Sequence, residues 1–233
     1  MRRLVKHFDF VNCDSLAEAD WNIQVGDKWA NSELQHYVNT PKNLFFNNGL
    51  VIRATFDSGI YNSCRINTRD KFFFKYGRID IVAKVPKGKG TWPALWMMSQ
   101  ENKYGNWPKS GEIDIMEHVG RNENQVFLCL HTETYNHRNS EQYYFETKVE
   151  NATDEFHKYS IDWDEQGITY YIDDDLIVKY NKADKADSSH KGWPFDQEFF
   201  LIINLAIGGK FGGEVADSIF PADFIIKDIK VFQ

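Results

Sequence analysis

The chain has 233 residues, which is long enough to bury a substantial core and allows one large domain or two small ones. Its formal net charge of −7 argues against nucleic acid and anionic membranes as partners, because both favour basic patches. A neutral polysaccharide is compatible with this charge. The aromatic content of 15%, with 7 Trp, also supplies flat apolar surfaces on which sugar rings can lie.

From the N-terminus onward, short apolar runs separated by turn signals predict one β-strand after another, and no segment shows a long, capped helical pattern. The stretch 182–191 is linker-like but too short to divide the chain, so we expect a single domain over residues 1–233. The pattern favours an all-β, antiparallel β-sandwich of the jelly-roll type with a concave cleft. Strands are predicted over 49–56, 63–67, 76–85, 94–99, 112–118, 126–132, 143–149, 157–163, 168–172, 176–180, 199–206 and 224–232.

The three cysteines, Cys13, Cys64 and Cys129, cannot all pair with one another, and none has the spacing of a metal site. We expect buried free thiols, with one disulfide as the alternative. The sequence also lacks the glycine-lysine pattern of a P-loop and the paired histidines of a catalytic zinc site. No apolar run of about 18 residues occurs, so no membrane-spanning helix is predicted.

The most informative segment is Glu112-Ile-Asp-Ile-Met-Glu117, in which three carboxylates alternate with apolar residues. On a strand, Glu112 and Asp114 point to one face, because side chains alternate with a period of two. Glu117 then falls on the opposite face unless a β-bulge near Ile115 or Met116 absorbs one residue. Bulges re-aim side chains in this way beside active sites. The segment therefore predicts an acidic row backed by a core.

The spacing of this row fits the two carboxylates of a glycosidase. With a bulge, Glu112 and Glu117 are about 13 Å apart along the backbone, and two extended side chains can bring their carboxyls to roughly 5 to 5.5 Å. That separation is typical of a retaining enzyme, in which one Glu is the nucleophile and the other a general acid and base. The spacing alone equally fits the solvated face of an amphipathic strand.

The segment resembles the Glu-x-Asp-x-x-Glu signature of glycoside hydrolase family 16, in the bulged form of laminarinase-type endo-β-1,3-glucanases. The resemblance covers nearly the whole chain and includes Pro86-Lys-Gly-Lys-Gly-Thr-Trp-Pro-Ala-Leu-Trp-Met97 and Trp193-Pro-Phe-Asp-Gln197. It implies that Glu112 is the nucleophile and Glu117 the acid/base. The other similar segments are 31–37, 63–66, 76–78, 107–108 and 204–209.

Five further residues are candidates for substrate binding. Trp92 and Trp96 share parity on or beside a strand, so both can face the cleft that holds the carboxylates, although each could instead be a core residue. By resemblance, Asn31 and Arg65 hold sugar hydroxyls, and His131 lies close to the acid/base. The alternatives are a turn residue for Asn31, a surface ion pair for Arg65 and a structural strand histidine for His131.

The resemblance implies a retaining endo-β-glucanase that hydrolyses laminarin-like β-1,3-glucan by double displacement. Mixed-linkage β-1,3-1,4-glucan and galactans stay open as substrates, because linkage choice depends on a few contacts around the scissile bond. A non-catalytic β-glucan-binding module is the other function class. Such a module has no need for three carboxylates at this spacing, so the sequence favours the enzyme.

The remaining expectations concern cofactors, partners and localisation. No cofactor is required for this chemistry, and we expect a monomer whose partner is the polysaccharide, with no nucleic acid and no membrane. Family members often hold a structural calcium with an acidic residue in the last strand, but Lys227 stands at that position, which argues against it. A substrate too large to cross a membrane favours secretion, with any signal peptide absent from this sequence, because charges interrupt its first nine residues.

Overall fold

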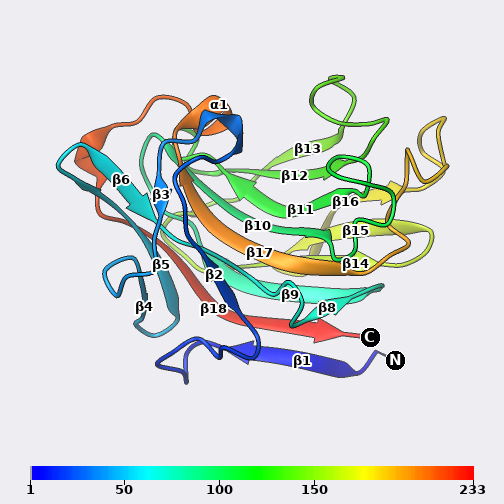
Figure 1. Cartoon of the computed structure of the whole chain (residues 1–233). Coiled ribbons are helices and arrows are strands. Elements are labelled where there is room, and N and C mark those ends of the chain that lie inside the picture. The colour runs from blue at the N-terminus through cyan, green and yellow to red at the C-terminus, as the bar shows by residue number, and fades with distance from the viewer. Residues whose placement is uncertain (1) are drawn as a thin grey trace.

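The computed structural model describes residues 2–233, which form two β-sheets packed face to face (Figure 1). One sheet has ten strands in the order β16-β15-β14-β9-β18-β5-β6-β3, with β1 paired to β18 and β4 paired to β5. Its strands are β1 (Leu4–Asp9), β3 (His36–Tyr37), β4 (Leu44–Phe46), β5 (Leu50–Asp57), β6 (Ile60–Ser63), β9 (Gly77–Lys84), β14 (His157–Trp163), β15 (Gly167–Ile172), β16 (Asp175–Asn181) and β18 (Ala222–Phe232).

The other sheet has eight strands in the order β13-β12-β11-β10-β17-β7-β2, with β8 paired to β17. Helical structure in the described residues is limited to short turns: η1 (Ala30–Ser32), α1 (Gly209–Gly212) and η2 (Asp217–Ile219). The strands of this sheet are β2 (Asn22–Gln24), β7 (Arg65–Asn67), β8 (Phe73–Phe74), β10 (Thr91–Ser99), β11 (Glu112–His118), β12 (Gln125–His131), β13 (Tyr143–Lys148) and β17 (Phe199–Ile207).

The core lies between the two sheets, and the period of the strands explains how it is filled. In β9 every second residue is buried, so Ile79 and Ile81 face the core while the residues between them are partly exposed. In β18 the pattern changes parity at a register shift between Ile226 and Asp228. Lys227 falls at this shift and its ammonium lies 4.0 Å from the centre of the Phe156 ring. The shift lets both halves of this long strand supply core residues.

The predicted all-β sandwich is confirmed, and each predicted strand has a counterpart. The strands at 112–118 and 157–163 have the predicted bounds. The single strand predicted at 63–67 is two strands in the structure, because Ser63 ends β6 in one sheet and Arg65 begins β7 in the other. The sequence did not predict five short N-terminal strands, namely β1, β2, β3, β4 and β8.

The prediction of three buried thiols is correct for Cys64 and Cys129 and wrong for Cys13, which is exposed. Cys13 lies after β1 in a stretch of polar, exposed residues, so no core surrounds it. All three cysteines are free, and residues 2–233 contain no disulfide. Within the same range, no helix has the length and apolar character needed to cross a bilayer.

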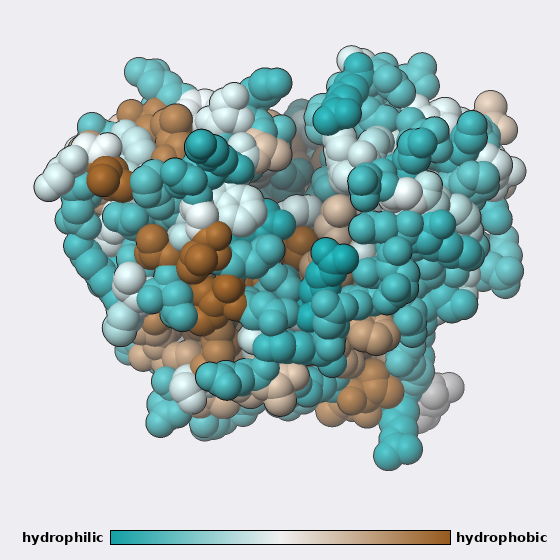
Figure 2. All heavy atoms as spheres, viewed as in Figure 1, coloured by the Kyte–Doolittle hydropathy of each residue, from teal (hydrophilic) through white to brown (hydrophobic). Residues whose placement is uncertain are grey.

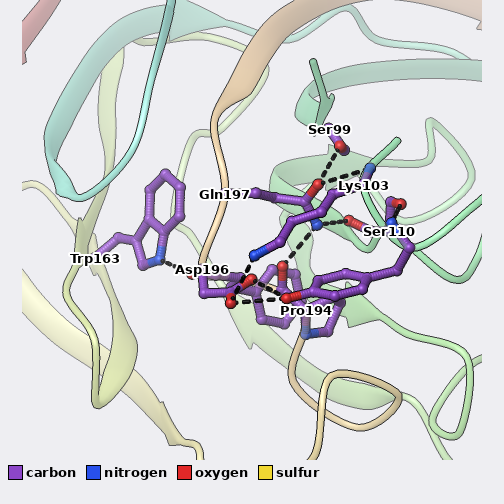
Figure 3. Close-up of polar contacts among 9 residues, drawn as sticks. Ser99, Lys103, Ser110, Trp163, Pro194, Asp196 and Gln197 are labelled. Atoms are coloured by element: carbon purple, nitrogen blue, oxygen red, sulfur yellow. Dashed lines mark hydrogen bonds and ion pairs between the residues drawn. The ribbon is translucent and has the colours of Figure 1, made fainter. Parts of the chain in front are cut away.

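A cluster of hydrogen bonds around Gln197 fixes the loop that leads into β11 (Figure 3). The Gln197 amide accepts a hydrogen bond of 2.6 Å from the Ser99 hydroxyl, and it donates to the carbonyls of Ser110 and Pro194. The adjacent Gly111 has a φ of 83°, and a Cβ there would lie 2.8 Å from the Pro194 ring. This packing sets where β11 begins, and therefore where its first residue, Glu112, projects.

We expect Gln197→Ala to lower the free energy of unfolding by about 3 kcal/mol or more. The reason is that it leaves buried carbonyl and hydroxyl groups without partners, and each such group costs about 1 to 3 kcal/mol. Urea unfolding followed by tryptophan fluorescence measures the change. Glu198→Ala, at the exposed neighbouring position, is the matched control and should stay within about 0.5 kcal/mol of the wild type. Equal stability of the two variants would contradict this account.

Candidate active site

A β-bulge in β11 turns all three carboxylates toward the same face. On the side of β10, Glu112 pairs with Met98, Asp114 pairs with Trp96, and Glu117 pairs with Ala94. Five residue steps along β11 therefore match four residue steps along β10. The extra residue is Ile115, because Leu95 pairs with Met116. Ile115 and Met116 are consecutive, yet both are buried in the core. The predicted irregularity is therefore confirmed at the predicted place.

The carboxylates lie in a cleft with a volume of about 360 Å³ on the concave face of the eight-stranded sheet. In the space-filling view the surface is hollowed between the part that carries α1 and the part that carries β13 (Figure 2). Strands β10 and β17 supply the floor with their even-numbered residues. The lining residues are Trp29, Ala30, Asn31, Glu33, Arg65, Trp92, Ala94, Trp96, Met98, Trp107, Glu112, Asp114, Glu117, His137, Arg138, Asn204 and Ala206.

Burial raises the pKa of the Glu112, Asp114 and Glu117 carboxyls above their usual range. The charge of Asp114 raises the pKa of both glutamates further, because like charges in a buried site disfavour ionisation. The three groups therefore hold fewer than three negative charges at neutral pH and titrate as one coupled set. Such a set can supply an ionised nucleophile and a protonated acid at the same pH, although the common direction of the shifts does not distinguish their roles.

Trp92 contacts Glu117 directly. Its indole Nε1–H donates a hydrogen bond of 2.9 Å to Glu117 Oε1, and this bond lowers the pKa of Glu117 against the effect of burial. The Trp92 side chain is mostly buried and packs edge to face against Phe211. Trp92 thus lines the cleft as predicted, and it also belongs to a small apolar cluster beneath it.

Trp96 and Arg65 form the wall on the other side of the carboxylates. The Arg65 guanidinium lies 4.8 Å from the Trp96 ring centre and 5.0 Å from that of Trp29, within range of cation–π attraction. Its Nε donates to Gln24 Oε1, and the Trp96 indole donates to Asn204 Oδ1. Arg65 is therefore held rigidly beside the cleft. It is held by aromatic rings and an amide, and not by the surface ion pair of the alternative interpretation.

His131 lies beside the carboxylates, on the neighbouring strand β12, and is only 7% exposed. It pairs with Glu112 in the register of β11 and β12, and its Nε2 lies 3.3 Å from Asp114 Oδ2 and 3.8 Å from Glu112 Oε1. Within the described residues, the cleft lining does not include His131. The structure therefore brings His131 to the acidic row, where it can tune the carboxylates, rather than to the open wall.

Asn31 is brought to the cleft by the η1 turn, where its φ of 59° places it in the left-handed region that Asn tolerates. The same turn carries Glu33 into the lining. Burial raises the pKa of Glu33, while a hydrogen bond from Gln35 Nε2 opposes the shift. A carboxyl group at this point can accept hydrogen bonds from a bound sugar.

Sequence reasoning missed several lining residues. Met98 and Asn204 could have been found by parity, because Met98 lies two residues beyond Trp96 and Asn204 pairs with Ala94 across the floor. Trp107, His137 and Arg138 lie in loops and have no periodic signal. Arg138 places its guanidinium 4.6 Å from the Trp107 ring centre, so two separate loops meet over the cleft.

We expect Trp92→Phe to move the basic limb of the kcat/KM pH profile upward. The hydrogen bond from Trp92 lowers the pKa of Glu117, so its removal raises this pKa and keeps Glu117, the acid/base that the resemblance implies, protonated to higher pH. Initial rates across the pH range give both limbs of the profile. Trp96→Phe is the matched control, because its indole donates to Asn204 and to no carboxylate. A basic limb that moves downward, or moves equally in both variants, would contradict the assignment.

Comparisons with known proteins agree with this geometry. The model for "Glycosyl hydrolases family 16" matches residues 29–214. A beta-glucanase of Rhodothermus marinus is 37% identical over 225 residues, which cover 91% of this chain and 79% of that protein. The crystal structure of a laminarinase from Flavobacterium sp. UMI-01 matches with a TM-score of 0.91 and 41% identity, covering 99% of this chain and 100% of the other.

The structure of the laminarinase from Rhodothermus marinus matches with a TM-score of 0.94 and 36% identity, covering 100% of this chain and 98% of that one. These likenesses extend over nearly the whole chain. They confirm the family resemblance that the motif around Glu112 indicates. The chain is a glycoside hydrolase and belongs to glycosyl hydrolases family 16.

Proposed function

We propose that this glycoside hydrolase is an endo-acting, retaining β-1,3-glucanase that cleaves laminarin-like polysaccharides by double displacement. The observation that carries the proposal is the bulge, which sets Glu112, Asp114 and Glu117 on one face of a cleft lined by Trp92 and Trp96. The substrate class is supported by the similar proteins, which are named as laminarinases and a beta-glucanase.

The two displacements divide the work between the two glutamates. In the first, a Glu112 oxygen bonds to the anomeric carbon while the glycosidic bond breaks, and Glu117 gives its proton to the departing oxygen. In the second, Glu117 takes a proton from water, the water oxygen bonds to the anomeric carbon, and the ester to Glu112 breaks. Glu117 is then protonated again, and the configuration at the anomeric carbon is retained.

Asp114 and His131 complete the proposed machinery. Asp114 stands between the two glutamates in the bulged strand, and its charge disfavours ionisation of both. His131 opposes that effect, because its charge lowers the pKa of Glu112 and Glu117. The proposed role of this pair is to set how many protons the glutamates share, so that one stays ionised while the other stays protonated.

The arrangement of the site also supports three subsidiary proposals. We propose a monomer, because one chain supplies the whole set of residues that lines the cleft. No cofactor is needed, because proton transfer and nucleophilic attack are both carried by carboxylates. Action outside the cell follows from a polymeric substrate that does not cross membranes. Light scattering of the purified protein tests the first proposal, and activity after exhaustive chelation tests the second.

The substrate proposal is tested by reducing-end release and product sizing on laminarin, mixed-linkage glucan, agarose and carrageenan. Laminarin is expected to give the highest kcat/KM, with oligosaccharides of mixed length as early products. Proton NMR of those products should show the β-anomer first, because double displacement retains configuration. Preference for mixed-linkage glucan would contradict the proposed β-1,3 specificity. Early α-products would contradict the proposed double displacement.

A further inference from the structure

A cysteine thiol lies directly beside the acidic row, on the neighbouring strand β12. Cys129 of β12 pairs with Asp114 of β11, and it shares a strand face with His131, two residues further on. Its side chain is buried, with 3% of the residue exposed. By contrast, Cys64 is buried in the main core and Cys13 is exposed near the N-terminus. Cys129 is therefore the thiol that the fold places against the catalytic carboxylates.

Three different donor atoms meet at this point. One carboxylate oxygen of Asp114, the Cys129 sulfur and one ring nitrogen of His131 all lie within 4.8 Å of one another. In tetrahedral zinc sites the donors are about 2.0 to 2.3 Å from the metal, and hence about 3.3 to 3.8 Å apart. The cluster needs only a small contraction to reach that geometry. Glu112 Oε1, 3.8 Å from His131 Nε2, is placed to act as a fourth ligand.

Unsatisfied polar atoms show that the cluster has spare coordination capacity. Asp114 is only 3% exposed, yet within residues 2–233 its Oδ2 finds no hydrogen-bond partner. The nearby His131 Nε2, at 3.3 Å, lacks the alignment of a hydrogen bond. An unpaired buried oxygen costs about 1 to 3 kcal/mol, so a ligand that satisfies it gains that free energy.

The donor set selects the class of ligand. A thiolate and an imidazole favour Zn²⁺ or Cd²⁺ over Mg²⁺ and Ca²⁺, which prefer oxygen alone. The nearby Glu112, the ionised member of the pair in the proposed mechanism, adds negative charge, which attracts a cation into the cleft. On binding, the sulfur–hydrogen bond of Cys129 is replaced by a sulfur–metal bond, and the proton leaves to solvent. No electron transfer accompanies this exchange.

We propose that Asp114, Cys129 and His131 form a binding site for a thiophilic divalent cation such as Zn²⁺ or Cd²⁺, and that its occupation blocks hydrolysis. The bound cation occupies Asp114 and draws the Glu112 carboxylate away from the anomeric carbon. The inhibitory part rests on the proposed function, whereas the binding part does not.

Binding is tested with Cd²⁺ alone, without substrate. Ultraviolet thiolate-to-cadmium absorption and equilibrium dialysis are measured on the wild type and on Cys129→Ser. The wild type is expected to bind one ion per chain with the absorption band, and Cys129→Ser to lose the band and bind at least about tenfold more weakly. Cys13→Ser and Cys64→Ala are matched controls that keep both signals. Undiminished binding by Cys129→Ser, or the absence of the band in the wild type, would overturn the site.

Inhibition is tested with Zn²⁺ on laminarin hydrolysis, expressed for each variant relative to its own rate without metal. The Zn²⁺ concentration for half-inhibition should rise at least about tenfold in Cys129→Ser and stay unchanged in Cys13→Ser. Circular dichroism and thermal unfolding confirm that Cys129→Ser is folded, and His131→Gln provides a second variant for the cadmium titration. Equal sensitivity of Cys129→Ser and the wild type would overturn the blocking role. Absence of laminarin hydrolysis would instead fault the proposed function, since the cadmium titration is independent of it.

Discussion

Glu112→Gln is expected to lower kcat on laminarin by roughly 10⁴-fold or more, as loss of a covalent nucleophile does in other hydrolases. The amide keeps the size of the side chain but cannot form the ester with the anomeric carbon. Purified protein is assayed for reducing ends over long incubations, so that residual rates are measured. KM should change little, because the loss falls on the transition state rather than on ground-state binding.

The matched control for this experiment is Glu133→Gln. Glu133 follows β12 and lies outside the cleft lining, near Lys109. Its loss should leave kcat within about twofold of the wild type, because a partly exposed carboxylate at 3.9 Å from its lysine partner is a weak electrostatic partner. If Glu112→Gln retains more than a tenth of the activity, the nucleophile is a different group and the assignment fails.

The acidic row could be predicted from the sequence because it depends only on residues within one strand. Strand parity puts Glu112 and Asp114 on one face and Glu117 on the other, and only a bulge reconciles the three. The structure supplies that bulge at Ile115. The even-numbered residues of β10, which include Trp92 and Trp96, follow from the same period. These features depend on neighbours within one strand and therefore leave a trace in the sequence.

The loop residues of the cleft could not be predicted in this way. Trp107 and Arg138 are 31 positions apart in the sequence, and their contact depends on where two irregular loops return. β1 was missed for a related reason, because it pairs only with β18 at the margin of its sheet and buries a single residue, Phe8. Cys13 was misjudged because composition alone favours burial of a free thiol.

Glu117→Ala is expected to lower kcat on laminarin by about 10² to 10⁴-fold, the range for loss of a general acid. The loss should be smaller for an aryl β-glucan oligosaccharide, because a phenolate departs with little protonation. With that substrate the ester to Glu112 accumulates, since no base activates water for the second displacement. A burst of phenolate, and the glycosyl-enzyme mass in an intact-protein spectrum, measure the accumulation.

Azide then distinguishes the two glutamates. In Glu117→Ala it occupies the vacated space, attacks the ester on Glu112 and gives a β-glycosyl azide of retained configuration. In Glu112→Ala it replaces the nucleophile itself and gives the α-glycosyl azide by one inversion. Proton NMR reads the anomer directly. The reverse pairing of variants and anomers would exchange the two roles, and it would show that Glu117, not Glu112, attacks the sugar.

Thermal unfolding shows whether variants at Glu117 are folded, and the Tm is also expected to depend on pH through this residue. Burial raises the pKa of Glu117 in the folded chain from 4.5 to about 8, so the folded state resists ionisation. Its protonated form contributes stability below pH 4.5, and this contribution is lost as pH rises toward 8. Glu117→Gln carries no such charge, so its Tm should exceed that of the wild type by a margin that grows across this interval. A margin that shrinks with pH would mean that Glu117 is ionised in the free enzyme, and the general acid would then have to be sought elsewhere in the row.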